Sequence, residues 1–320
     1  MTGALLPDIG VAPGSALAAL VDAVLAAWPE HAKFLRQSFA GREAGVMDVS
    51  ETVADLIEAV AAAAGRPLAA YAADYRFLCE EIVFPEELFF RREGRYRLST
   101  FAEAEREVYA NAPLMARYMN GLIVSDALWR NHACAMADFA LHYLAGPGGE
   151  GRHLEIGPGH GLLLHLALRH GRHSRIHAWD VSRTSIIHTG HVLEVLGQHR
   201  AVTLAIRNIY DREAVDAAAG CYDSVILSEV VEHLEDPLGA LQSVRRLLAE
   251  GGRLWANAPA NGPAPDHLFL FRHPDELADL IRRAGFEIVR TADHPVTGAT
   301  LERVIRQELP ISCCVEAVAA

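Results

Sequence analysis

The chain has 320 residues, of which 51% are hydrophobic, and a formal net charge of −12. This length and apolar content allow two domains that each bury a core. The excess of acidic side chains argues against a nucleic-acid partner, whose phosphate backbone is also negatively charged. No apolar run reaches the roughly 18 residues of a membrane span and the amino terminus has no secretory pattern, so we expect a cytoplasmic protein without a membrane partner.

The first part of the chain, residues 1–145, predicts a mainly helical unit. Residues 48–64 and 68–82 have helical composition, and residues 87–99 alternate in polarity as a β-hairpin does. Helices followed by a hairpin are typical of a winged helix. Because a basic recognition helix is missing, we interpret this unit as a dimerisation and substrate-lid domain.

Residues 101–144 predict further long helices with apolar faces. Met115, Met119 and Trp129 lie on these faces, which favours a core or a dimer interface over a cofactor site. Large apolar patches usually meet a partner, so the pattern predicts a homodimer. The glycine-rich residues 145–151 predict the domain boundary.

The second part opens with a short apolar strand, residues 152–156, that leads into glycines on alternate positions and then into a helix-like stretch, 162–170. Glycine permits positive φ and close approach of a ligand, and the N–H groups of a helix start favour polar or anionic groups. The spacing is not the dinucleotide fingerprint G-x-G-x-x-G, because Leu162 occupies the third glycine position. We interpret His160 as a neighbour of the cofactor rather than a base. The motif residues are Glu155, Gly157, Gly159 and Gly161.

Strand-like and helix-like segments then alternate, which predicts a parallel sheet covered on both faces. The first of these strands ends at Asp180, about twenty residues past the turn, where a carboxylate can accept hydrogen bonds from ribose hydroxyls. An aspartate at this position can instead cap the next helix. The expected strands are residues 174–179, 202–206, 222–228, 251–257 and 285–289.

Together these features resemble the class I S-adenosylmethionine (SAM) methyltransferases. The resemblance covers roughly residues 150–309 and leaves residues 310–320 as a tail. It implies an α/β, Rossmann-like fold with a mostly parallel seven-stranded sheet and SAM as cofactor. It places the following residues at the cofactor: Glu155, Gly157, Gly159, Gly161, Asp180, Val181, Asn208, Ile209 and Ser228.

A second group of polar side chains follows the strand over residues 222–228. A helical turn there puts Glu229, Glu232 and His233 on one face, at positions i, i+3 and i+4. Carboxylates suit magnesium or manganese, and imidazole also suits zinc or iron. His267 is the fourth candidate ligand, because it follows the next strand and ligands bind at the carboxyl ends of parallel strands.

These four residues therefore predict a divalent metal site, with catalytic roles for Glu232, His233 and His267. Many methyltransferases, however, use an acidic residue and a histidine at this place without a metal, to orient the substrate or to cap the helix. The order E-x-x-E-H followed by a distant histidine resembles the metal site of the small-RNA terminal 2′-O-methyltransferases. Its first part also resembles the ubiquinone-pathway O-methyltransferases.

The helical first unit and residues 108–122 resemble the 2-oxo acid C-methyltransferases of antibiotic pathways, of which 2-ketoarginine methyltransferase is an example. This resemblance implies a small-molecule substrate in secondary metabolism, with metal-assisted methylation at the β-carbon of a 2-oxo acid. Metal-assisted O-methylation of a catechol or vicinal hydroxyl is the first alternative. A non-catalytic SAM-binding regulator is the second.

Overall fold

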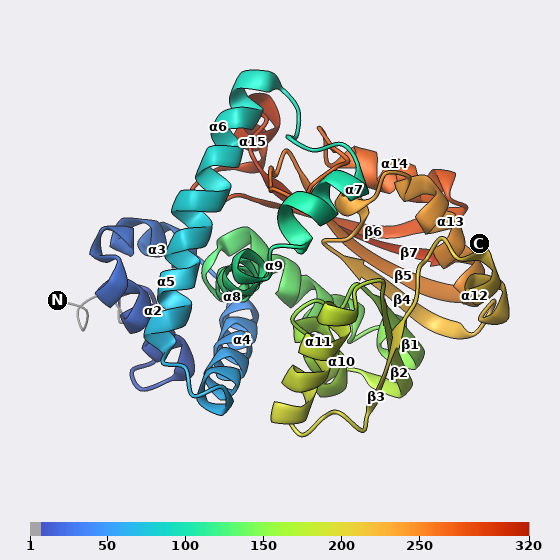
Figure 1. Cartoon of the computed structure of the whole chain (residues 1–320), viewed down its shortest axis with the longest axis horizontal. Coiled ribbons are helices and arrows are strands. Elements are labelled where there is room, and N and C mark those ends of the chain that lie inside the picture. Colours follow the sequence, from blue (N-terminus) through green and yellow to red (C-terminus); the bar gives the residue numbers. More distant parts are fainter. Residues whose placement is uncertain (1–7, 320) are drawn as a thin grey trace.

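The computed structural model describes residues 8–319 and shows a helical part beside a twisted β-sheet with its own flanking helices (Figure 1). Over these residues, no helix is both long and apolar enough to cross a membrane.

The first part is helical, as expected, and its helices α4 (Ala44–Ala63) and α5 (Leu68–Phe77) overlap the predicted segments 48–64 and 68–82. A π-helical segment, Leu78–Val83, joins α5 to α6 and makes one long rod (Figure 1). Similar π-helical segments follow α7 at Glu105–Tyr109 and α9 at Phe139–Tyr143. The helices are α2 (Ala16–Ala27), α3 (Ala32–Phe39), α4 (Ala44–Ala63), α5 (Leu68–Phe77), α6 (Phe84–Glu93), α7 (Phe101–Ala104), α8 (Ala112–Leu128) and α9 (Arg130–Asp138).

The hairpin predicted over residues 87–99 is wrong, and with it the winged-helix interpretation. Its first half, residues 87–93, belongs to helix α6, where Arg91 Nε donates to Glu87 Oε1 at 2.6 Å, one helical turn away. Gly94 ends the helix in the left-handed region, at φ 66°, and its N–H donates to the carbonyl of Phe90. Glycine at this position is the usual end of a helix rather than the centre of a hairpin turn.

The second part contains the expected sheet, in the order β3-β2-β1-β4-β5-β7-β6. All neighbouring strands are parallel except β7, which runs antiparallel between β5 and β6. The strands are β1 (Glu150–Ile156), β2 (Arg172–Asp180), β3 (Val202–Ile206), β4 (Tyr222–Ser228), β5 (Leu248–Ala260), β6 (Phe286–Pro295) and β7 (Ile311–Ala319).

Residues 310–320 are not a tail, because strand β7 occupies most of them and completes the sheet. The buried Glu316 on this strand has partners on both neighbouring strands. Its carboxylate accepts from Arg253 Nη1 at 3.0 Å and lies 3.9 Å from Arg290 Nε. The final strand is therefore part of the methyltransferase-like domain that was expected to end at residue 309.

Helices cover both faces of the sheet, as predicted. One apolar cluster joins α12, α13 and α14 to one face, and another joins α10, α11 and the helices of the first part to the other. The first part therefore shares a core with the sheet domain. The remaining helices are α10 (Leu162–His170), α11 (Arg183–Val195), α12 (Arg212–Ala217), α13 (Pro237–Leu247), α14 (Asp275–Arg283) and α15 (Leu301–Gln307).

The apolar residues that motivated a homodimer pack within the chain. Trp129 Nε1 donates to the hydroxyl of Tyr75 at 2.8 Å, and Met115 and Trp129 pack against the shared core. Met119 lies over the glycine turn, since a Cβ on Gly159 would stand 3.6 Å from its Cε. The homodimer stays a prediction, but these side chains no longer argue for it.

Candidate active site

The strand order places a switch point between β1 and β4, which are neighbours although β2 and β3 separate them in the sequence. In open α/β sheets, ligands bind in the crevice outside the carboxyl ends of the strands at such a point. The glycine turn follows β1, and the segment that begins with Glu229 follows β4. The two predicted groups of functional residues therefore meet at one edge of the sheet.

The glycine turn adopts a backbone that requires glycine. Gly157, Gly159 and Gly161 have φ values of 72°, 50° and 77°, in the left-handed region that other residues rarely adopt. A Cβ on Gly157 would stand 2.7 Å from Val230 Cγ2, so the turn also lies tight against the segment after β4. Just before the turn, burial raises the pKa of Glu155 well above its usual range, and its Oε2 has no hydrogen-bond partner among the described residues. This turn can hold a polar ligand close to its backbone.

Asp180 lies at the end of β2, at the same edge of the sheet. Its Oδ1 accepts from the Ser182 N–H at 2.8 Å and its Oδ2 accepts from Ser185 Oγ at 2.5 Å. These bonds fix the carboxylate at the start of helix α11. Each carboxylate oxygen can accept a second bond, so the local contacts remain compatible with a bound ribose.

The other predicted cofactor residues lie at the ends of β2, β3 and β4. Val181 is half exposed, Ile209 is buried, and Asn208 is exposed and accepts from the Tyr210 N–H through its Oδ1 at 2.9 Å. Ser228 ends β4 and receives a long contact of 3.5 Å from Asn257 Nδ2. The structure thus brings the predicted residues to one edge. Their contacts with SAM remain predictions.

The segment after β4 differs from the expected helical turn. Glu229 has a left-handed backbone at φ 50°, and a short 3₁₀ turn, Val231–His233, follows. The side chain of Glu229 is directed to β5, where its Oε1 accepts a hydrogen bond from Asn257 Nδ2 at 2.9 Å. The i, i+3, i+4 register is therefore wrong, and Glu229 is not part of the ligand cluster found among the described residues.

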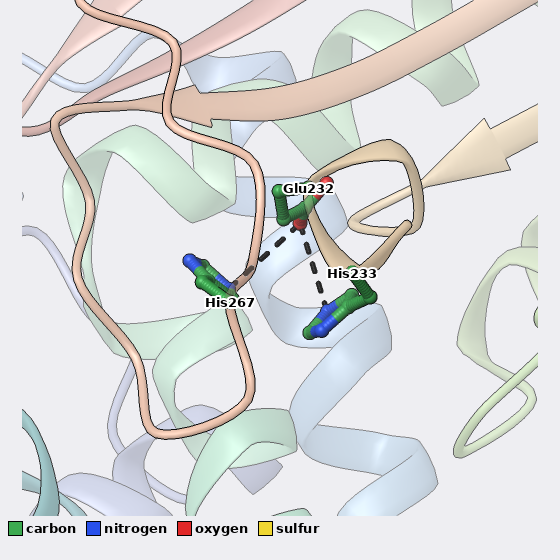
Figure 2. A group of neighbouring side chains, drawn as sticks. All are labelled: Glu232, His233 and His267. Carbon is green, nitrogen blue, oxygen red and sulfur yellow. Dashed lines mark ion pairs between the residues drawn. The ribbon is translucent and has the colours of Figure 1, made fainter. Parts of the chain in front are cut away.

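The other three candidate ligands come together (Figure 2). One atom each from Glu232, His233 and His267 lies within 4.8 Å of the other two. Glu232 Oε1 stands 3.8 Å from Nε2 of His233 and 3.9 Å from Nε2 of His267. Ligand atoms around a tetrahedral zinc ion are about 3.3 Å apart, so both distances from Glu232 would have to shorten by roughly half an ångström to close the set around a metal.

The second nitrogen of each imidazole is already engaged. His233 Nδ1 donates to the carbonyl of Asp266 at 3.0 Å, and His267 Nδ1 donates to the carbonyl of Gly262 at 2.7 Å. In a neutral ring, such a bond fixes the tautomer whose Nε2 carries the lone pair, and both Nε2 atoms lie within 4 Å of Glu232. A metal-ligating histidine usually has such a carbonyl or carboxylate behind it.

The carboxylate of Glu232 is fully buried, and neither of its oxygens has a hydrogen-bond donor among the described residues. Burial, followed by the nearby Glu229, raises the pKa of Glu232 well above its usual range. Burial also lowers the pKa of His267 to about 3, so this ring is neutral and its lone pair is free. A buried carboxylate without a donor, faced by two lone pairs, fits a divalent cation.

The first part of the chain contributes side chains that the sequence did not suggest. The Tyr109 hydroxyl lies 3.3 Å from His233 Nδ1, and the Tyr118 hydroxyl donates to Asp266 Oδ1 at 3.1 Å. The ring of Tyr96 packs edge-on against His267, 5.5 Å away. No short-range pattern could indicate these contacts, because more than 120 positions separate Tyr109 and Tyr118 from their partners.

A model of the methyltransferase domain family matches residues 128–291, which is about half of the chain and contains Glu232, His233 and His267. The chain belongs to the class I SAM-dependent methyltransferases. Membership of this family supports SAM as the cofactor.

Over 157 residues this methyltransferase is 31% identical to the ubiquinone biosynthesis O-methyltransferase of Cereibacter sphaeroides, a match that covers 43% of this chain and 61% of the relative. Relatives from other strains of that organism match equally. The chain thus spans about three fifths of the length of these curated relatives.

Solved structures are similar at lower identity. The geranyl diphosphate C-methyltransferase from Streptomyces coelicolor A3(2), crystallised with Mg²⁺, geranyl diphosphate and S-adenosyl-L-homocysteine, is 16% identical, with a TM-score of 0.49 over 64% of this chain and 85% of that chain. A SAM-dependent methyltransferase from Aquifex aeolicus is 16% identical, with a TM-score of 0.41 over 53% of this chain and 82% of that chain. These likenesses carry no inference about the substrate.

Proposed function

We propose that this methyltransferase transfers the methyl group of SAM to a small acceptor chelated by a divalent metal at Glu232, His233 and His267. The observation that carries the proposal is the unpaired, buried carboxylate of Glu232, faced by two imidazoles whose outer nitrogens are already held by carbonyls. Leaving such a carboxylate ionised without a partner costs several kcal/mol in order of magnitude. A cation removes that cost.

The site lies close to the cofactor turn. Val230, two residues before Glu232, packs against Gly157, so a group held by Glu232 lies beside the predicted SAM position. Methyl transfer is an in-line displacement in which the acceptor attacks the methyl carbon and the sulfonium sulfur leaves with its electron pair as a thioether. Holding the acceptor about 3 Å from the methyl carbon supplies much of the rate enhancement in such a reaction.

The acceptor must also lose a proton. When bound, a divalent metal lowers the pKa of a chelated hydroxyl or stabilises the enolate of a chelated 2-oxo acid. Glu229 is an electrostatic neighbour of Glu232 outside the ligand set, and burial raises its pKa, which brings it closer to the range of a useful general base. In this proposal Glu229 accepts the proton of the acceptor, while Asn257 holds its Oε1 in place.

Two acceptor classes offer the paired oxygens that chelation needs. The first is a 2-oxo acid, methylated at its β-carbon, as the sequence led us to expect. The second is a catechol or vicinal hydroxyl, methylated on oxygen, and the 31% identity to an O-methyltransferase favours it. Both use the same metal set and differ only in the atom that attacks.

The experiment that tests the proposal is a mass-spectrometric screen with SAM labelled by CD₃ at the methyl group. Panels of 2-oxo acids, catechols and vicinal diols are incubated with the full chain and magnesium, manganese, zinc or ferrous iron. We expect a labelled product from one of the chelating panels, and no product with monohydric phenols that present a single oxygen. Equal turnover of monohydric phenols, or turnover unaffected by exhaustive chelation, would overturn the metal-assisted reaction.

A further inference from the structure

A buried cluster of one carboxylate and two imidazoles adjoins the glycine turn and has no part in the mechanism above. Asp126 of α8 lies between His132 of α9 and His160, the residue between Gly159 and Gly161. Asp126 Oδ1 is 3.1 Å from His132 Nδ1, and Asp126 Oδ2 is 3.2 Å from His160 Nε2. The three side chains are less than one fifth exposed.

Hydrogen bonds within the cluster favour the charged forms of Asp126 and His132. Burial opposes ionisation, but hydrogen bonds from the two imidazoles prevail and lower the pKa of Asp126. Burial likewise opposes a charge on His132, yet its bond to Asp126 prevails and raises the pKa of that ring. The cluster thus combines a carboxylate with imidazoles, and His160 Nδ1 is a buried ring nitrogen without a partner among the described residues.

Its position relative to the turn is fixed from two sides. Helix α8 lies over the turn through Met119, and Thr189 of α11 donates its hydroxyl to the Gly159 carbonyl at 2.8 Å. The strand-end Asp180, predicted to bind the ribose, stands at β2, beside the turn. The end of the cofactor that points away from the adenosine therefore lies at the turn after β1, where the cluster stands.

That end of SAM is an amino acid, with an ammonium and a carboxylate. A mixed cluster of a carboxylate and imidazoles complements such a zwitterion better than a cluster of one sign does. We propose that Asp126, His132 and His160 recognise the amino-acid end of SAM, so that the helical first part of the chain completes the cofactor site.

The experiment compares two ligands that differ only at this end. S-adenosylhomocysteine carries the amino-acid portion, and 5′-methylthioadenosine has the same adenosine and a thioether but no ammonium or carboxylate. Calorimetry on the full chain measures both affinities in the wild type, Asp126→Asn and His160→Gln. We expect the variants to lose about ten- to a hundredfold in affinity for S-adenosylhomocysteine and less than about twofold for 5′-methylthioadenosine.

The second ligand reports whether the variant still has a folded cofactor site. If the cluster had a purely structural role, its variants would lose affinity for both ligands equally. Asp74→Asn is the matched control, because Asp74 of α5 is also buried and bonded to α8, through Arg117 and Asn120, and over residues 8–319 its hydrogen bonds involve no residue of the turn. It should leave the ratio of the two affinities unchanged.

A selective loss of S-adenosylhomocysteine affinity in either cluster variant supports the assignment. Equal losses for both ligands, or no loss in either variant, would overturn it. His160→Gln keeps the test decisive if Asp126→Asn does not fold, since the backbone of the turn is also held by Thr189. The outcome does not depend on the metal or on the acceptor, so it stands or fails apart from the proposed reaction.

Discussion

In the metal-free protein, folding stability should fall less with rising pH when Glu232 is replaced by glutamine. The folded-state pKa of Glu232 is raised above its unfolded value, so its contribution to stability is present below the unfolded pKa and is lost as the pH rises toward the folded pKa. Each pH unit over which the folded carboxyl stays protonated while the unfolded one is ionised lowers the free energy of unfolding by about 1.4 kcal/mol. Between pH 5 and pH 7 this amounts to at most about 3 kcal/mol. Glutamine does not titrate and avoids the loss.

The assay is urea unfolding of wild type and Glu232→Gln in a chelator at pH 5 and pH 7, and again with zinc or magnesium. In the chelator, the wild type should lose more stability than the variant between the two pH values. With metal, the wild type should become more stable than the variant, because a ligand at a hundred times its Kd stabilises the folded wild type by about 2.7 kcal/mol. The variant lacks the carboxylate and should gain much less.

Glu155→Gln is the matched control. Glu155 is equally buried, its pKa is also raised by burial, and it lies outside the metal set. Like Glu232→Gln, this variant should lose less stability than the wild type between pH 5 and pH 7. Unlike Glu232→Gln, it should be stabilised by metal as much as the wild type is. If Glu232→Gln follows the same pH dependence as the wild type, or if metal stabilises it as much, the account of Glu232 as a buried carboxylate awaiting a cation is refuted.

Three further predictions concern the cofactor, the chemistry and the assembly. Asp180→Ala should weaken SAM binding by about ten- to a hundredfold in calorimetry, and Gly159→Val should abolish it because the turn needs a left-handed backbone there; wild-type affinity in both variants would reject the cofactor placement. His233→Ala should lose methyl transfer while SAM affinity stays near wild type, whereas a parallel loss of SAM affinity would indicate a role in folding. The homodimer predicted from the sequence is tested by light scattering at micromolar concentration: twice the chain mass would support it, and the mass of one chain would refute it.

Most of the sheet could be predicted because six of its seven strands are marked locally. Apolar runs end at turns with glycine or aspartate, and helices of amphipathic pattern separate them, so the alternation alone indicates a parallel sheet. The last strand was missed because a short apolar stretch near the end of the chain looks like a tail until its neighbours are known. Glu316 in its middle becomes a plausible strand residue only beside Arg253 and Arg290, which are remote in sequence.

The hairpin failed for a different reason. The segment over residues 87–99 alternates in polarity, but Glu87 and Arg91 also stand one helical turn apart, and Gly94 suits a helix end as well as a turn. Both patterns occur in the same residues. Packing against the rest of the protein decides between them, and packing is not visible in a short window.

For the metal set, the residue types were predicted correctly, but the helical turn that was to align them was not. Glu232, His233 and His267 do converge, but the helical turn that was to align them with Glu229 is absent, because Glu229 adopts a left-handed backbone. A residue other than glycine in that region is uncommon and has no sequence signature. Contacts from the first part of the chain, such as Tyr109 to His233, depend on tertiary structure in the same way.

The most direct test of the central claim is the metal content of the purified full chain, measured by elemental analysis after dialysis. We expect one divalent ion per chain in the wild type and in Glu155→Gln, and none in the double variant His233→Ala/His267→Ala, which should still bind SAM. Equal metal in the wild type and the double variant would contradict the assignment of the site. So would a metal-free wild type that transfers methyl groups at full rate after exhaustive chelation.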